Sequence, residues 1–196
     1  MLIPNVITRN GNSERVADIY STMLEKRIIF VQGEVNDAMA NTIVAQILYL
    51  EMENPTSPIT LYINSPGGSV TAGLAIKDTM DYVSCPVHTV GIGSCASMGA
   101  FLLASGEPGQ RRVLKNTSVM IHQPLGGYQG QATDILIHAE RIHNLKETLT
   151  KYLSDYTQGR VDYDTMIGMC ERDNFLTAEE AVYYGLVDEV VEKINH

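Results

Sequence analysis

The chain has 196 residues, of which 44% are hydrophobic and 19% charged, and its formal net charge is −9. A chain of this length suffices for one domain with its own core, because such a domain hides about 70% of its unfolded surface. The negative charge disfavours binding to nucleic acid or to an acidic membrane surface, and the absence of an apolar run of roughly 20 residues disfavours a membrane span.

The first predicted strand covers residues 27–32, which are rich in β-branched and aromatic side chains. Asn36 is a suitable N-cap for the helix that follows. The apolar residues of this helix recur with helical spacing and predict its buried face: Ala40, Ile43, Ile47 and Leu50.

Three similar units come next, each a strand, a turn of small residues and a helix. The strands are expected over 59–64, 87–92 and 118–122, and the helices from about Val70, Ser97 and Gln131. This repetition is typical of parallel βαβ crossovers, so the fold class is α/β in one domain. The nearly continuous apolar run of the second strand favours a sheet covered on both faces.

The helix predicted from Gln131 to Tyr156 is long for a crossover and polar over much of its surface. We expect it to project and to pack against another subunit. Further on, Thr177 and Glu180 form a capping box at the start of a last helix, and Gly185 is placed to end it.

The candidate functional residues are expected at the carboxyl edge of the predicted sheet, because ligands of parallel sheets bind where the carboxyl ends of the strands meet. The turns expected there carry Gly67 and Gly68, then Ser97, then His122. A hydroxyl at a helix N-terminus lies near free N–H donors such as that of Met98, which can stabilise an oxyanion. Ser97 is therefore a candidate nucleophile, with a plain N-cap as the alternative. The surrounding segment misses the Gly-x-Ser-x-Gly elbow because Cys95 stands at its first glycine position.

His122 is the candidate general base, because its imidazole titrates near neutral pH. The remaining histidines are expected to be packed or on the surface: His88, His138, His143 and His196. Spacing leaves the orienting acid open among several aspartates: Asp134, Asp155, Asp162, Asp164 and Asp173.

The Gly67–Gly68 turn lacks the residues that complete a phosphate-binding loop, so it is either a plain tight turn or a source of a second oxyanion donor. Such a glycine segment also leaves edge hydrogen bonds for an extended peptide.

The 3 cysteines have no Cys-x-x-Cys spacing, which predicts buried free thiols in a reducing compartment and no metal site. The first residues lack a signal-peptide pattern and no processed propeptide is evident, so we expect a cytoplasmic protein.

Four stretches carry a resemblance to a known family: YINSPGGSVTAG, ASMGAFLL, VMIHQPLGGYQGQATDI and ERDNFLTAEEAVYYGLVDEV. They closely resemble the proteolytic subunit of the Clp protease, and the likeness runs over residues 4–191. The resemblance implies the ClpP/crotonase-like fold with a projecting handle at about 125–157. It also implies a serine endopeptidase with the triad Ser97, His122 and Asp173.

The same resemblance assigns further roles. The oxyanion donors would be the N–H groups of Gly68 and Met98, and peptide would bind along two segments: Gly68, Ser69 and Val70, and Leu125, Gly126 and Gly127. Two stacked heptameric rings, homomeric or mixed with a paralogue, would enclose a chamber entered past an axial segment at about 1–18. Glu171 and Arg172 would make contacts between the rings. An ATP-driven AAA+ unfoldase would deliver unfolded protein, and this chain itself would need no cofactor.

Three departures from the family pattern are visible. The stretch from Gln158 to Cys170 is longer than usual, which could misplace Asp173. Cys95 is unusual beside the nucleophile and could be oxidised or narrow the pocket. Tyr62 keeps an aromatic of the docking surface for the unfoldase, but Arg112 stands where an aromatic is common.

Three other functions remain open at this point. The chain could be a poorly active subunit that modulates an active paralogue, as the long stretch before Asp173 and Arg112 would suggest. It could be an acyl-CoA enzyme of the related crotonase fold, which needs paired N–H groups but no triad. A hydrolase that uses Cys95 as its nucleophile is the last alternative.

Overall fold

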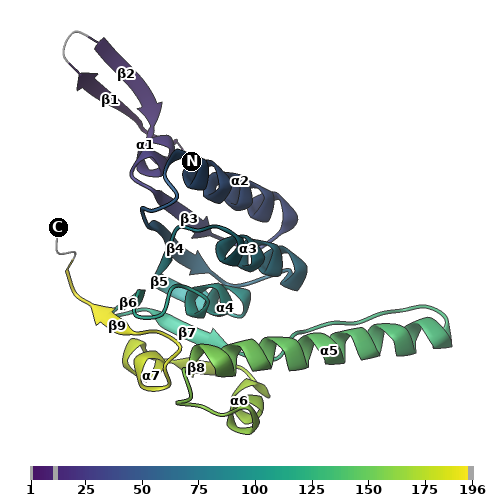
Figure 1. The fold of residues 1–196 in the computed structure, drawn as a ribbon. Coiled ribbons are helices and arrows are strands. Elements are labelled where there is room, and N and C mark those ends of the chain that lie inside the picture. Colours follow the sequence, from purple (N-terminus) through teal and green to yellow (C-terminus); the bar gives the residue numbers. More distant parts are fainter. Residues whose placement is uncertain (1, 11–12, 194–196) are drawn as a thin grey trace.

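The computed structural model describes residues 2–10 and 13–193 (Figure 1). Its helices are α1 Ile19–Glu25, α2 Asp37–Glu53, α3 Val70–Tyr82, α4 Met98–Ala104, α5 Ala132–Tyr156, α6 Tyr163–Cys170 and α7 Ala178–Tyr183. Its strands are β1 Asn5–Asn10, β2 Ser13–Asp18, β3 Ile28–Gln32, β4 Ile59–Ser65, β5 Val87–Ala96, β6 Arg111–Leu114, β7 Ser118–Ile121, β8 Asn174–Leu176 and β9 Glu189–Val191. Residues 1, 11–12 and 194–196 lie outside the described part of the chain, and with them parts of the axial segment expected at 1–18.

The main sheet has the strand order β3-β4-β5-β6-β9, with every neighbouring pair parallel. β5 is long enough to pair twice: its first half lies beside β6 and its last residues lie beside β7. β8 then joins β7 in the antiparallel sense. The parallel βαβ arrangement predicted from the sequence is confirmed, and the pairing of β8 is a non-local addition to it.

Two segments project from this body (Figure 1). β1 and β2 form an antiparallel hairpin at one end of the molecule. The helix α5 extends away at the other end, with the irregular segment 122–131 running along it. A helix of 25 residues is about 38 Å long, and only Leu149, Thr150 and Leu153 of α5 are buried. The expectation of a projecting helix is confirmed.

The helix caps and the buried helix face that were predicted from local sequence patterns are present in the structure. The Asn36 side chain accepts a hydrogen bond of 3.0 Å from the Met39 N–H at the start of α2. The four residues predicted for the buried face of α2 are all in the core. Thr177 and Glu180 make both hydrogen bonds of the capping box, and Gly185 takes a φ of 77° just after α7.

The core lies between the helices and one face of the main sheet. Along β4, the residues Ile59, Leu61 and Ile63 are fully buried, whereas Thr60 and Tyr62 on the other face are only half-buried. The expectation of a sheet covered on both faces came from β5, and there Thr89 and Val90, on opposite faces, are both buried. The expectation holds for the middle of β5 and fails for β4. No helix in the described ranges is both long and apolar enough to cross a membrane.

A buried ion pair joins the last strand to the body. The Arg111 side chain is 2% exposed and contacts Asp188 through two hydrogen bonds, of 2.9 and 2.5 Å. The same guanidinium donates to the carbonyls of Ala104 and Tyr156, the last residues of α4 and α5. Burial alone would raise the pKa of Asp188, but the hydrogen bonds and charge of Arg111 outweigh it, and the pKa is lowered from its ordinary value of 3.8.

We expect Arg111→Met to lower the free energy of unfolding by about 3 kcal/mol at pH 7, because it strands a partly buried carboxylate. Since the pKa of Asp188 is lowered on folding, its stabilising contribution is present above about pH 4 and is lost as the pH falls through the folded value. The difference in unfolding free energy between the native chain and Asp188→Asn, measured in urea from pH 7 to pH 3, should therefore narrow as the pH falls below about 4. A constant difference across that range would contradict this account.

Candidate active site

The register of three strands brings the candidate residues to one place. Ala96 at the end of β5 pairs with Met120 of β7, and Ile121 of β7 pairs with Asn174 of β8. Ser97, His122 and Asp173 each lie one residue beyond a paired position. The three side chains therefore meet where these strands end.

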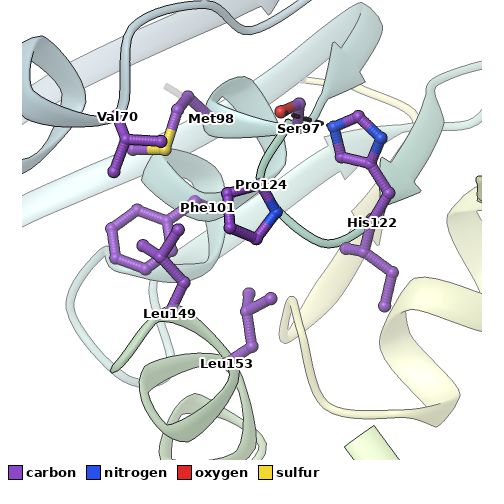
Figure 2. A pocket seen from close by; sticks show the side chains of 9 residues that line it. Val70, Ser97, Met98, Phe101, His122, Pro124, Leu149 and Leu153 are labelled. Carbon is purple, nitrogen blue, oxygen red and sulfur yellow. Dashed lines mark hydrogen bonds between the residues drawn. The ribbon is translucent and has the colours of Figure 1, made fainter. Parts of the chain in front are cut away.

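The distances between the three side chains are those of hydrogen bonds. His122 Nε2 lies 2.8 Å from Ser97 Oγ (dashed line in Figure 2), and His122 Nδ1 lies 3.0 Å from Asp173 Oδ1. The His122 side chain is 13% exposed and that of Asp173 is 63% exposed. The expected misplacement of Asp173 by the long preceding stretch is not seen, because that stretch folds into α6 and leaves the carboxylate within reach.

The other candidate aspartates occupy different positions. Asp162 caps α6 through the Thr165 N–H, and Asp155 pairs with Lys151. Asp134 and Asp164 lie in the first turns of α5 and α6. Among the five aspartates that spacing left open, Asp173 is the one whose carboxylate lies within hydrogen-bond distance of His122.

Ser97 has an unusual backbone, with a φ of 54° and a ψ of −120°. Its side chain makes no capping hydrogen bond to α4, so the interpretation of Ser97 as a plain N-cap is wrong. The Ser97 N–H instead donates to the carbonyl of Met120 at 2.8 Å, which holds the turn against β7. Strain of this kind persists only where the surroundings impose it, and here it presents the hydroxyl to His122.

Two backbone N–H groups belong to segments that adjoin Ser97. Met98 is the first residue of α4, where an N–H has no acceptor within the helix. The Gly67 carbonyl accepts a hydrogen bond of 2.8 Å from the Val35 N–H, and the trans peptide therefore turns the Gly68 N–H away from Val35. A Cβ on Gly67 would come within 2.6 Å of the Ser97 Cβ and 2.9 Å of the Met98 nitrogen, so this turn packs directly on Ser97.

An apolar pocket opens beside Ser97 and His122 (Figure 2). Its lining comes from α3, α4, β7, α5 and the segment after His122: Val70, Ser97, Met98, Phe101, Ile121, His122, Pro124, Leu149 and Leu153. No charged side chain other than a protonatable histidine lines it. The pocket can accept an apolar side chain next to the Ser97 hydroxyl.

Val70, from one of the two segments expected to bind peptide, lines this pocket, and so does Pro124, the residue just before the other segment. The Ser69 hydroxyl caps α3 through the Ala72 N–H and is thus engaged in the fold. Leu125 is 84% exposed. Gly126 packs against Ile142, where a Cβ would come within 2.6 Å of the Ile142 Cδ1.

Cys95 does not take part in the site. Its side chain is fully buried, its thiol donates to the Ile63 carbonyl at 3.2 Å, and burial raises its pKa to about 12. The residue is absent from the pocket lining, so the expectation that it narrows the pocket is wrong. A thiol held in this way is a poor nucleophile, and its burial also opposes oxidation.

We expect Cys95→Ala to retain peptide cleavage within about twofold and to lower the free energy of unfolding by about 1 kcal/mol, the typical cost of a small core truncation. Iodoacetamide should leave Cys95 unmodified in the folded chain and alkylate it in urea, as intact and peptide mass would show. Rapid alkylation of the native chain at Cys95, or loss of cleavage in the alanine variant, would contradict this assignment.

Gln123 is a residue that sequence analysis missed. Its backbone N–H donates to the Cys170 carbonyl at 2.6 Å, and its side-chain amide donates to the Glu171 carbonyl at 2.8 Å. These bonds tie the residue after His122 to the segment before Asp173. Its position next to the candidate base was the only signal available in the sequence.

The remaining candidates have plain structural surroundings. The Glu171 carboxylate pairs with Lys146 of α5 at 3.0 Å, and this hydrogen bond lowers its pKa. Arg172 is exposed. His138 stacks on Tyr128, and His143 lies 3.3 Å from Glu147, so both are away from the site as expected.

His88 is half-buried, and its pKa is lowered by desolvation and by the charge of Arg112. His196 lies outside the described residues. Within the part of the chain that the structure describes, no group of three or more His, Cys, Asp or Glu side chains could hold a metal ion.

One comparison with known proteins bears on the whole chain. A family model described as Clp protease matches residues 11–194. The match spans both the α/β body and the site, and it confirms the resemblance inferred from the four motifs.

Proposed function

The chain belongs to the Clp protease family, and on that premise we propose that it is a serine endopeptidase subunit that hydrolyses peptide bonds of unfolded polypeptides. The observation that supports this best is His122, whose two ring nitrogens lie within hydrogen-bond distance of Ser97 Oγ and Asp173 Oδ1. A fold that only bound acyl thioesters through paired N–H groups would have no use for this chain of three side chains.

The proposed chemistry is acyl transfer through Ser97. His122 Nε2 takes the hydroxyl proton as the Ser97 oxygen attacks the peptide carbonyl, and the N–H groups of Gly68 and Met98 hold the resulting oxyanion. His122 then gives that proton to the leaving amine, and the C–N bond breaks. His122 then takes a proton from water as the water oxygen attacks the acyl-enzyme, and it returns that proton to Ser97 Oγ as the acyl C–O bond breaks and the carboxylic acid leaves.

Asp173 keeps the His122 ring in the tautomer that carries a proton on Nδ1 and stabilises the imidazolium that forms at each step. Substrate would lie extended between Gly68–Val70 and Leu125–Gly127, with one side chain in the apolar pocket. Main-chain pairing of this kind is tolerant of sequence, which suits a substrate that arrives unfolded. No cofactor is needed for any of these steps.

The proposal extends to assembly in two stacked heptameric rings, with α5 as the contact between them. Ile135, Leu136 and Ile137 on α5 are 42, 70 and 58% exposed, which is costly for an isolated helix and is relieved if a second copy covers them. Glu171 and Arg172 would lie at the same contact. The β1–β2 hairpin would belong to the axial entrance.

Docking of a cytoplasmic, ATP-driven AAA+ unfoldase is proposed on the half-buried face of the sheet. Tyr62, Val90, Arg112 and Glu189 are successive cross-strand neighbours on that face. Arg112 Nε lies 3.5 Å from a Glu189 carboxylate oxygen, so one end of the row is charged. This pair supports a second candidate function, a subunit that shares its ring with a paralogue and alters docking.

Peptide turnover combined with intact-mass detection of a covalent adduct tests the proposal. The purified chain should hydrolyse short fluorogenic peptides, and a serine-reactive fluorophosphonate should add once per chain, at Ser97. Turnover only after mixing with an active paralogue would favour the second candidate. Absence of both turnover and labelling, alone and in mixtures, would refute the peptidase.

A further inference from the structure

We propose that Ser65 is a positioning residue of the oxyanion hole, because its buried hydroxyl holds the turn that carries the Gly68 N–H. The inference rests on the proposed peptidase function and adds to it a residue outside the triad. Ser65 is the last residue of β4 and is fully buried.

The Ser65 hydroxyl joins two loops at the carboxyl edge of the sheet. Its Oγ donates to the Gly33 carbonyl, just after β3, at 2.6 Å. The same Oγ accepts a hydrogen bond of 3.1 Å from the Gly67 N–H. A hydroxyl has one proton to give, so donation to Gly33 leaves its lone pairs for Gly67, and both roles are filled.

The Gly67–Gly68 segment is held between Ser65 on one side and Val35 on the other, and the Ser69 N–H also donates to the Val35 carbonyl at 2.8 Å. The Gly67 N–H is bound by Ser65, and the Gly67 carbonyl is bound by the Val35 N–H. The φ values of Gly67 and Gly68 are 93° and 148°, which only glycine adopts readily. Such a flexible pair needs fixed partners if the Gly68 N–H is to keep one direction.

The position of Ser65 follows from an irregularity in the sheet. β4 and β5 pair in regular register up to Ile63 and Gly91, and then shift so that Ser65 lies opposite Cys95, two residues before Ser97. Ser65 thus lies between the turn with the Gly68 donor and the strand end with the nucleophile. Gly99 of α4 approaches so closely that its Cβ would lie 2.7 Å from the Ser65 carbonyl oxygen.

Without the hydroxyl, the Gly67 N–H loses its partner, and the Gly67–Gly68 peptide is held only from its Val35 side. The direction of the Gly68 N–H then becomes less precise. Catalysis depends on donors aimed at the developing oxyanion, whereas substrate binding depends on other contacts. We therefore expect Ser65→Ala to lower kcat by roughly 10- to 100-fold with KM changed by less than about threefold.

Thr89→Val is the matched control. Thr89 is also fully buried, on the neighbouring strand β5, and its hydroxyl donates to the Leu103 carbonyl at 2.7 Å, away from the turn. It should lower the melting temperature as a lost buried hydrogen bond does and leave kcat within about twofold. If Ser65→Ala does not fold, Ser65→Cys, which keeps a weak donor and acceptor, replaces it with an expected fall in kcat of about 3- to 30-fold.

The experiment measures kcat, KM and melting temperature for the assembled wild type and each variant on one fluorogenic peptide. A selective loss of kcat in the Ser65 variant supports the proposal. Unchanged kcat in that variant, or an equal loss in Thr89→Val, overturns it while the peptidase stands. A wild-type chain that neither turns over peptide nor is labelled at Ser97 overturns the peptidase, and the role of Ser65 with it.

Discussion

Ser97→Ala should reduce kcat for peptide cleavage by on the order of 10⁶, to the background level, while the assembly stays intact. In the proposed mechanism the Ser97 oxygen forms the acyl-enzyme, and His122 Nε2 contacts this oxygen at 2.8 Å. The alanine variant should also lose the fluorophosphonate adduct. Turnover of a fluorogenic peptide and intact mass measure the two effects on the same sample.

Two further variants separate chemistry from folding. Ser94→Ala changes an exposed residue of β5, three positions before Ser97, and should keep full activity. Ser97→Gly should be as inactive as Ser97→Ala but more stable by about 1 kcal/mol, because glycine adopts the φ of 54° at this position without strain. Cleavage by Ser97→Ala at a rate comparable to wild type would remove Ser97 from the mechanism.

Asp173→Asn should reduce kcat by about 10⁴-fold and leave KM nearly unchanged. The asparagine amide would donate to His122 Nδ1, where the carboxylate accepts at 3.0 Å, and this would place the ring proton on Nε2. In that tautomer the nitrogen facing Ser97 cannot take its proton. Steady-state kinetics on a short peptide gives kcat and KM separately.

Asp164→Asn is the control for this substitution, because Asp164 lies in the first turn of α6 and does not contact His122. It should retain activity within about twofold, as a surface change away from the site. An active Asp173→Asn variant would mean that the exposed carboxylate does not orient the imidazole. The long stretch from Gln158 to Cys170 would then displace Asp173 from His122 in the assembled protein.

Much of the fold could be predicted from the sequence because the relevant forces act locally. The cap at Asn36, the capping box at Thr177 and the apolar face of α2 each depend on residues within one or two helical turns. The alternation of strands with helices follows from the same local patterns. Resemblance to the family motifs then identified the candidate site residues, including Asp173, whereas spacing alone could not choose among five aspartates.

Pairings between distant segments were not predictable in this way. The strand β8 has 3 residues, too few for a pattern, and its antiparallel pairing with β7 joins parts of the chain about 50 residues apart. The buried pair of Arg111 and Asp188 spans 77 positions. Each depends on closing a long loop, which only the packing of the whole domain compensates.

Local patterns were enough to predict the α/β class, the helix ends and the groups available for chemistry, since these depend on each residue and its near neighbours. Long-range packing was needed to show which carboxylate faces His122, that Ser97 is strained and makes no capping bond, and that Cys95 is buried in the sheet. Those outcomes depend on strand register, because a shift of one residue along β7 or β8 turns every side chain to the opposite face.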